Sequence, residues 1–170
     1  MAKKVMLGSL LILAAALLQS TVLSRLAIYV RAVPDIALCI LVYSAYVNGV
    51  MTGQLTGFFS GFLLDFFSAS PLGLNALIRT LTGAFEGLLK DTFYLDPFFL
   101  PMGLCAGATL FKAAAYFLLH LLFPEAVPAY SFSVPTFWIE LGMNSLLAPI
   151  IFSILKFVKP LYSGKKEADK

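Results

Sequence analysis

Charged side chains are scarce in this chain. Asp, Glu, Lys and Arg make up 12% of the 170 residues, whereas an ordinary soluble domain carries about 25%. Hydrophobic residues make up 60%, and a soluble chain of this length would need more polar residues to cover its surface. The composition therefore excludes an ordinary soluble domain. It predicts an all-α integral membrane protein, with apolar runs long enough to cross a hydrocarbon core about 30 Å thick.

Residues that bind metals or carry out catalysis are also few. The chain has one histidine, His120, and two cysteines, Cys39 and Cys105, each within an apolar run. Their spacing is not typical of a metal or redox site, and no nucleophile can be placed beside a base. We therefore expect no catalytic, cofactor or metal site and a protein that is not an enzyme. The net charge of +3 comes from lysines near the chain ends, so it indicates membrane topology and no nucleic-acid partner.

Six apolar segments follow one another along the chain. Residues 34–67 could form one helix, but at 1.5 Å per residue it would be about 51 Å long, beyond the ~30 Å core. The turn-prone pair Asn48-Gly49 divides it. The first segment is too long for a signal peptide, so we expect it to be retained. The prediction is one transmembrane domain over residues 1–162 and a charged tail over 163–170, with spans at about 5–23, 34–49, 52–67, 71–89, 97–123 and 135–158.

Positive charges predict how this bundle is oriented. Lys3 and Lys4 precede the first segment, Lys90 follows the fourth, and lysines cluster again after the sixth. Cytoplasmic segments of membrane proteins carry an excess of lysine and arginine. Six spans with both termini in the cytoplasm fit these positions, although Arg25 and Arg31 then fall on the outer side.

Apart from Asp35 and Lys156, which lie at the ends of their spans, five charged residues lie inside the predicted spans, where each costs about 3 kcal/mol or more at mid-bilayer. Helix rise places four of them in the outer half of the bundle, from about 3 Å below its outer end for Asp65 to about 16 Å for Lys112. We expect Asp65, Arg79, Lys112 and Glu140 to converge in a neutralising network. The alternative is that each side chain extends separately to the membrane surface.

The fifth charge, Glu86, lies four residues before Lys90. Glutamate followed by lysine at this spacing forms favourable pairs on helix surfaces. We therefore expect a local surface pair near the inner end of the fourth span.

Glycines recur at every fourth position of the stretch NGVMTGQLTGFFSGFLLDFFS, residues 48–68. Gly49 belongs to the predicted turn, which leaves Gly53, Gly57 and Gly61 on one stripe of the third span, directed at Asp65. Small residues let helix backbones approach closely in lipid. We expect this groove to admit a neighbouring helix of the same chain, and contact with a partner protein is the alternative.

Prolines mark several of the predicted helix boundaries. Pro34 suits a first helical turn, and Asp35 after it suits the positive end of the helix dipole. Pro149 instead lies inside the sixth span, where it removes one backbone hydrogen bond and is expected to bend the helix.

Three stretches of the sequence carry a resemblance to a known family. They are LLQSTVLSRL (17–26), PDIALCILVYSAYVNGVMTGQLTGFFSGFLLDFFSASPLGLNALIRTLTG (34–83) and NSLLAPIIFSILK (144–156). Together they resemble the rod-shape-determining membrane proteins of the MreD family. The most specific matches are Pro34-Asp35, the Gly57/Gly61/Asp65 series, the segment containing Asn75, and Asn144 with Ala148-Pro149. Residues 91–132 match in hydropathy alone.

The resemblance implies a six-span subunit of the bacterial cell-elongation machinery in the inner membrane. Members of the family bind MreC, and through it associate with MreB filaments, RodA and a class B penicillin-binding protein that together synthesise lateral peptidoglycan. The family is also similar in fold to the substrate-binding S components of energy-coupling-factor transporters. A vitamin-binding subunit is therefore the alternative, and it would need an outer-facing pocket of roughly 300 Å³ or more, which Arg79, Lys112, Glu140 and the loop 124–135 could line.

Overall fold

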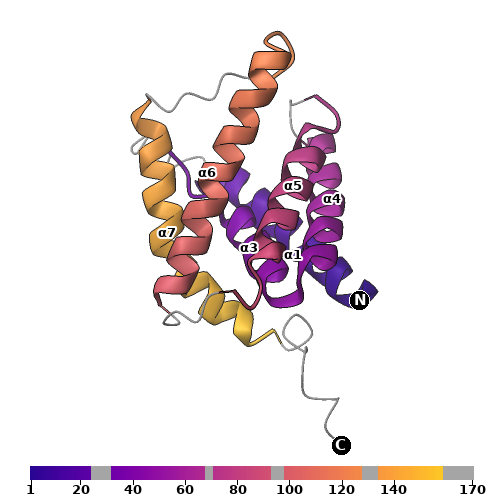
Figure 1. Cartoon of the computed structure of the whole chain (residues 1–170), viewed down its shortest axis with the longest axis vertical. Helices are drawn as coiled ribbons and strands as arrows, with labels where there is room; N and C mark the ends of the chain where they lie inside the picture. The colour runs from indigo at the N-terminus through magenta and orange to yellow at the C-terminus, as the bar shows by residue number, and fades with distance from the viewer. Residues whose placement is uncertain (24–31, 68–70, 93–97, 128–133, 159–170) are drawn as a thin grey trace, which may run out of the picture.

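The computed structural model describes residues 1–23, 32–67, 71–92, 98–127 and 134–158. Within these ranges the chain forms α-helices and one π-helical turn and no strand, which confirms the all-α prediction (Figure 1). The ends of each helical segment lie within three residues of the ends of a predicted span. The elements are α1 (Ala2–Leu18), η1 (Gln19–Leu23), α3 (Ile36–Asn48), α4 (Val50–Phe67), α5 (Leu74–Leu88), α6 (Phe99–Leu122) and α7 (Pro135–Lys156).

The sharp break between α3 and α4 occurs at Gly49. This residue has φ 89°, a left-handed conformation that glycine adopts without the penalty a side chain would bring. Its N–H donates to the carbonyl of Ala45 at 2.7 Å, and its own carbonyl accepts from Gly53 at 2.9 Å. One residue thus ends α3 and supplies the first acceptor for α4, so residues 34–67 form two helices as predicted.

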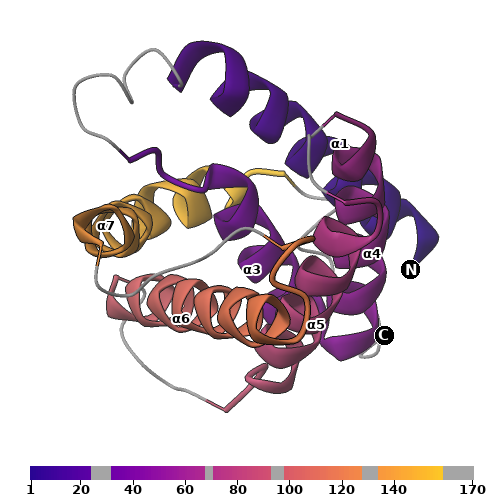
Figure 2. The same ribbon diagram turned by 90° about the horizontal axis from the view of Figure 1, so that it is seen from above.

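Helix α3 forms the centre of the bundle. Its residues 37–45 are all buried, and it contacts α1, α4, α5, α6 and α7. Viewed from above, the other helices surround it (Figure 2). A helix that is apolar on every side is stable when neighbours cover all of its faces, and α3 has this environment. Its side chains make up much of the core together with Ile12, Leu104, Cys105, Ala108, Ala148, Phe152 and Leu155.

Helix α7 contains the internal proline that the sequence indicated. Pro149 is buried within α7, and the helix changes direction between its upper and lower parts (Figure 1). Ser153 donates its hydroxyl hydrogen to the Pro149 carbonyl at 2.7 Å. The missing proline N–H accounts for the bend.

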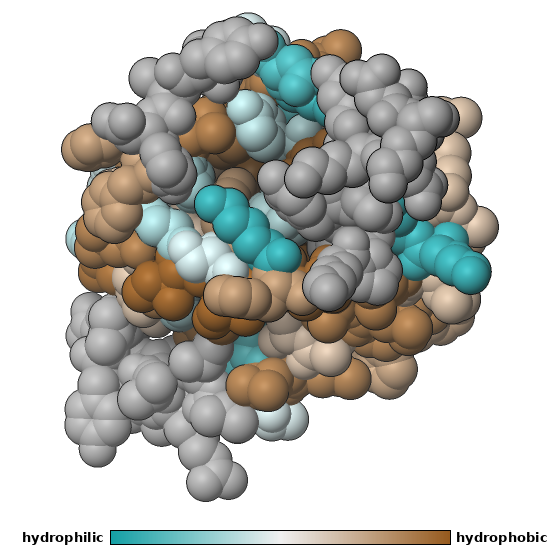
Figure 3. Space-filling model, turned by 90° about the horizontal axis from the view of Figure 1, so that it is seen from below, coloured by the Kyte–Doolittle hydropathy of each residue, from teal (hydrophilic) through white to brown (hydrophobic). Residues whose placement is uncertain are grey.

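The outer surfaces of the helices are hydrophobic. Leucine, phenylalanine and isoleucine side chains on α1, α4, α6 and α7 are exposed. In the view from below, brown hydrophobic side chains lie at the left and lower right, and teal hydrophilic side chains lie toward the middle (Figure 3). Three helical stretches in the described ranges are long and apolar enough to cross a membrane: Ala2–Thr21, Phe99–Leu122 and Pro135–Lys156. Helix α3, with 13 residues, is only about 20 Å long. The predicted count of six spans therefore stays a prediction.

Candidate functional site

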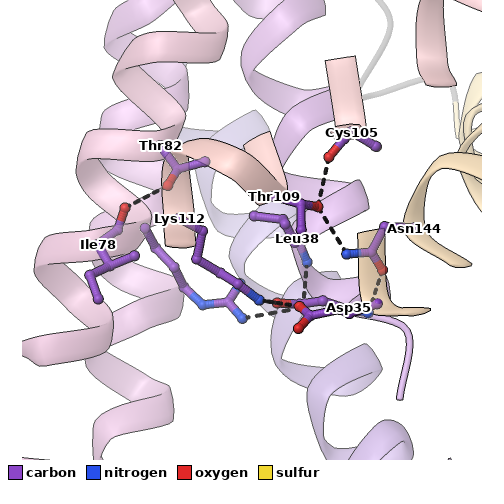
Figure 4. A network of polar contacts seen from close by, with 10 residues as sticks. Asp35, Leu38, Ile78, Thr82, Cys105, Thr109, Lys112 and Asn144 are labelled. Atoms are coloured by element: carbon purple, nitrogen blue, oxygen red, sulfur yellow. Dashed lines mark hydrogen bonds and ion pairs between the residues drawn. The ribbon is translucent and has the colours of Figure 1, made fainter. Parts of the chain in front are cut away.

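A lysine on α6 joins two acidic side chains from two other helices. The Lys112 Nζ lies 2.9 Å from Oδ2 of Asp35, at the start of α3, and 2.5 Å from Oε1 of Glu140 on α7. Each of the three side chains is about 14% exposed. Lys112 and Glu140, two of the four residues expected to converge, are thus in contact. Lys112 also contacts Asp35, which was not a member of the expected network (Figure 4).

Asp35 also begins α3. Its Oδ1 accepts from the Leu38 N–H at 2.9 Å, which satisfies one of the free N–H groups of the first helical turn. Pro34 is buried immediately before it. The sequence assigned Asp35 to the positive end of the helix dipole and did not include it in the charge network. One carboxylate serves both purposes because each of its oxygens faces a different donor.

Asn144 extends the cluster into the core. Its Oδ1 accepts from the backbone N–H of Asp35 at 2.7 Å, and its Nδ2 donates to Oγ1 of Thr109 at 3.0 Å. Thr109 in turn donates to the Cys105 carbonyl at 2.7 Å. Asn144 is fully buried, so one amide links α3, α6 and α7 at a position that is closed to bulk solvent (Figure 4). Sequence reasoning missed Thr109, which no spacing rule could have distinguished from the other threonines.

Arg79 of α5 lies at the edge of this cluster. Its Nη2 is 3.8 Å from Oδ1 of Asp35, which is within the range of an ion pair but too long for a hydrogen bond. Its Nη1 is buried and has no hydrogen-bond partner. Lys112 and Arg79 thus offset Asp35 and Glu140 in formal charge.

Asp65, the fourth expected member of the network, lies elsewhere. Its carboxylate accepts from the N–H groups of Gly73 (2.9 Å), Asn75 (3.0 Å) and Ala76 (3.2 Å), and from the Asn75 side-chain amide (2.9 Å). The described residues show no ion pair between Asp65 and Arg79. The free N–H groups at the start of a helix attract a carboxylate, and this attraction directs Asp65 to the start of α5.

The glycine stripe of α4 faces α5. A Cβ atom added to Gly53, Gly57 or Gly61 would lie closer than 3.0 Å to the backbone carbonyl oxygen of Gly83, Arg79 or Asn75, respectively. The two helix backbones are therefore in contact along most of their length, as small residues permit in lipid. The groove is filled by α5, a neighbouring helix of the same chain.

Glu86 does not form the expected surface pair with Lys90. The Glu86 side chain is 0% exposed, and neither carboxylate oxygen has a hydrogen-bond partner. It points into the bundle, where Gly107 of α6 is a neighbour. The Lys90 side chain instead passes close to Gly49. The i,i+4 spacing is present, but the packing of α5 against α3 and α6 turns Glu86 inward.

A small cavity adjoins Arg79 at the end of the bundle where α1 ends and α5 begins. Its volume is about 300 Å³, and Gln19, Ser20, Asn75 and Arg79 form its polar wall. Among the described residues no group of three or more His, Cys, Asp and Glu side chains could hold a metal ion. The polar residues that line this cavity can bind a polar ligand or join helices.

Comparison with known proteins gives one match. A family model described as "rod shape-determining protein MreD" matches residues 2–158, which is most of the 170 residues. No curated protein matches the chain, and no solved structure matches it. The family match confirms the resemblance drawn from the sequence.

Proposed function

The chain belongs to the MreD family of rod shape-determining proteins, and we propose that it is a non-enzymatic subunit of the cell-elongation complex. In this role it lies in the bacterial inner membrane as a six-span protein with both termini in the cytoplasm. It binds MreC directly, and it supports lateral peptidoglycan synthesis together with MreB, RodA and a class B penicillin-binding protein. Membrane lipid contacts the exposed hydrophobic faces of its helices.

The observation that best supports a scaffold is the filled interior of the bundle. Residues 37–45 of α3 are buried at its centre, and several polar side chains around them bond to one another. Lys112 holds Asp35 and Glu140, and Asn144 holds the Asp35 backbone and Thr109. A rigid interior of this kind holds the outer helix faces in fixed positions, and a scaffold presents such faces to its partners.

The filled glycine groove limits where a partner can bind. Because α5 already occupies the stripe of Gly53, Gly57 and Gly61, MreC has to contact another surface. Several exposed faces are available, including the outer side of α4, where Phe58, Phe62 and Phe66 form a continuous series of ring contacts.

Depletion of the protein from its host tests this role. Rod-shaped cells are expected to become round, and a plasmid copy of the wild-type chain is expected to restore their width and to co-purify MreC after detergent extraction. The matched variants are Gly57→Leu, which should fail to accumulate because α5 occupies its space, and Gly103→Leu, whose position has nothing within 4 Å. Normal cell shape after depletion would contradict the proposal.

The alternative is the vitamin-binding subunit of a transporter. The cavity of about 300 Å³ beside Arg79 is at the lower limit of the size expected for such a site. Two of the three charged residues that could have lined the pocket, Lys112 and Glu140, bind each other instead. Vitamin auxotrophy with normal shape in depleted cells would favour this alternative over the scaffold.

A further inference from the structure

The cavity beside Arg79 contains polar groups that the protein itself does not satisfy. It lies between the end of α1 with η1, the chain leading into α3, the end of α4 and the first turns of α5. Ala16, Val33, Ala37 and Leu64 form its apolar wall. In the proposed topology this position lies in the outer half of the bundle, where α1 ends and α5 begins.

Arg79 is the first unsatisfied group. A guanidinium has five N–H donors, but the described part of the chain offers Arg79 a single charged partner, Asp35, at 3.8 Å. Its Nη1 is buried without an acceptor, and its side chain is only 12% exposed. A cation removed from water needs acceptors nearby, so an oxygen-bearing ligand in this cavity would meet a free donor.

Gln19 is the second unsatisfied group, and it offers a hydrogen-bond acceptor where Arg79 offers a donor. Its Oε1 is buried and has no donor. Two other polar residues of the cavity wall donate hydrogen bonds within the protein: Ser20 donates to the Leu17 carbonyl at 2.9 Å, and the Asn75 side-chain amide donates to Asp65 at 2.9 Å. Among the buried side-chain atoms of the described residues that line this cavity, Nη1 of Arg79 is a donor without a partner and Oε1 of Gln19 is an acceptor without a partner.

The formal charge of the adjoining cluster selects among possible ligands. Arg79 and Lys112 offset Asp35 and Glu140, so the four residues sum to zero. A simple anion bound at Arg79 would leave one uncompensated negative charge where the dielectric is low, and a simple cation would leave one positive charge. A ligand that carries one charge of each sign keeps the sum at zero and satisfies both free groups.

We propose that this cavity binds the zwitterionic headgroup of an outer-leaflet phospholipid, one with a phosphate and a primary ammonium. The phosphate accepts from Arg79, the ammonium donates to Oε1 of Gln19, and the first methylenes of the lipid contact the wall formed by Ala16, Val33 and Leu64. Phosphatidylethanolamine has this chemistry, and soluble phosphoethanolamine shares it.

Native mass spectrometry of the detergent-solubilised full chain can test the site with four probes. Phosphatidylethanolamine is expected to bind best. Phosphatidylcholine has a phosphate but no N–H donor, and phosphatidylglycerol has a phosphate but no cation, so each should bind about tenfold more weakly, as expected for the loss of one charge-assisted hydrogen bond. Binding of soluble phosphoethanolamine would show that the headgroup alone is sufficient, and its failure beside bound phosphatidylethanolamine would assign the site to lipid.

Variants connect this binding to the cavity. Arg79→Gln and Gln19→Leu should each weaken phosphatidylethanolamine binding by about tenfold, whereas Lys156→Gln, at the exposed end of α7, should leave it unchanged. Gln19 has no bond to the charge cluster, so its variant tests the site even if Arg79→Gln fails to fold. Equal binding of phosphatidylglycerol, no retained lipid, or unchanged binding by Gln19→Leu would each overturn the proposal.

Discussion

The Nζ atom of Lys112, on α6, lies 2.9 Å from the Oδ2 atom of Asp35, the residue that caps the N-terminus of α3. The same Nζ bonds to Glu140 of α7. One ammonium thus connects the start of α3 with α6 and α7. Without it, two partly buried carboxylates would lie close together between the helices, so Lys112 is expected to be the most sensitive of the three positions.

Replacing Lys112 with methionine should destabilise the protein by about 3–5 kcal/mol, the cost of removing one partner from a buried ion pair. The free energy of unfolding can be measured by denaturant titration of the detergent-solubilised protein. Lys156→Met is the matched control, because Lys156 lies exposed at the end of α7. Equal stability of the two variants would show that the ion pairs contribute little.

Gly57→Ala and Gly103→Ala should change stability in opposite directions. The added methyl at Gly57 meets the Arg79 carbonyl oxygen, whereas nothing lies within 4 Å of the position at Gly103. Overpacking at the first site should cost about 1–3 kcal/mol or more. Alanine at the second should add about 0.5–1 kcal/mol of helix stability. Thermal unfolding of both variants in one detergent tests the contrast, and a loss of stability at both sites would contradict it.

The sequence predicted the positions of the helices better than it predicted which charged side chains contact one another. Gly49 separated α3 from α4, and the stripe from Gly53 to Gly61 indicated close packing, because backbone conformation and residue size are local properties. Asp65 and Asp35 were harder to tell apart. Both lie at the same end of the bundle, and helix rise gives the depth of a residue but not its rotation about the helix axis.

Glu86 is a second residue whose orientation about the helix axis could not be predicted from its spacing. Its spacing from Lys90 is that of a surface pair, yet the face of α5 that carries it packs inward. The α5 sequence is amphipathic, but in a membrane protein a polar face can point toward the bundle and an apolar face toward lipid. The spacing rule is drawn from soluble helices and does not distinguish these two cases.

Asp65→Ala should destabilise the protein by about 2 kcal/mol, since it removes the acceptor for the start of α5. Four donors, from Gly73, Asn75 and Ala76, would lose their partner. Asp65→Asn keeps one oxygen and should lose less. Hydrogen exchange of the Asn75 and Ala76 amides should accelerate in the alanine variant, while amides at the middle of α3 should not change. Uniform acceleration would point to global unfolding in place of a lost cap.

Glu86→Leu should make the protein more stable. The Glu86 carboxyl is fully buried and its oxygens have no hydrogen-bond partner, a situation that costs about 1–3 kcal/mol. Leucine has a similar size and no polar group to satisfy, so the gain should approach that range. Glu140→Leu is the matched comparison, and it should destabilise because Glu140 is bonded to Lys112.

Cell shape adds a second measurement to the Glu86 variant. A protein that is more stable and still restores rod shape in depleted cells would show that the buried carboxyl is dispensable. A protein that is more stable but leaves the cells round would show that the carboxyl serves the function at the expense of stability, as expected of an ionisable residue kept inside a membrane bundle. Lower stability would contradict the prediction and indicate that Glu86 is satisfied in the folded protein.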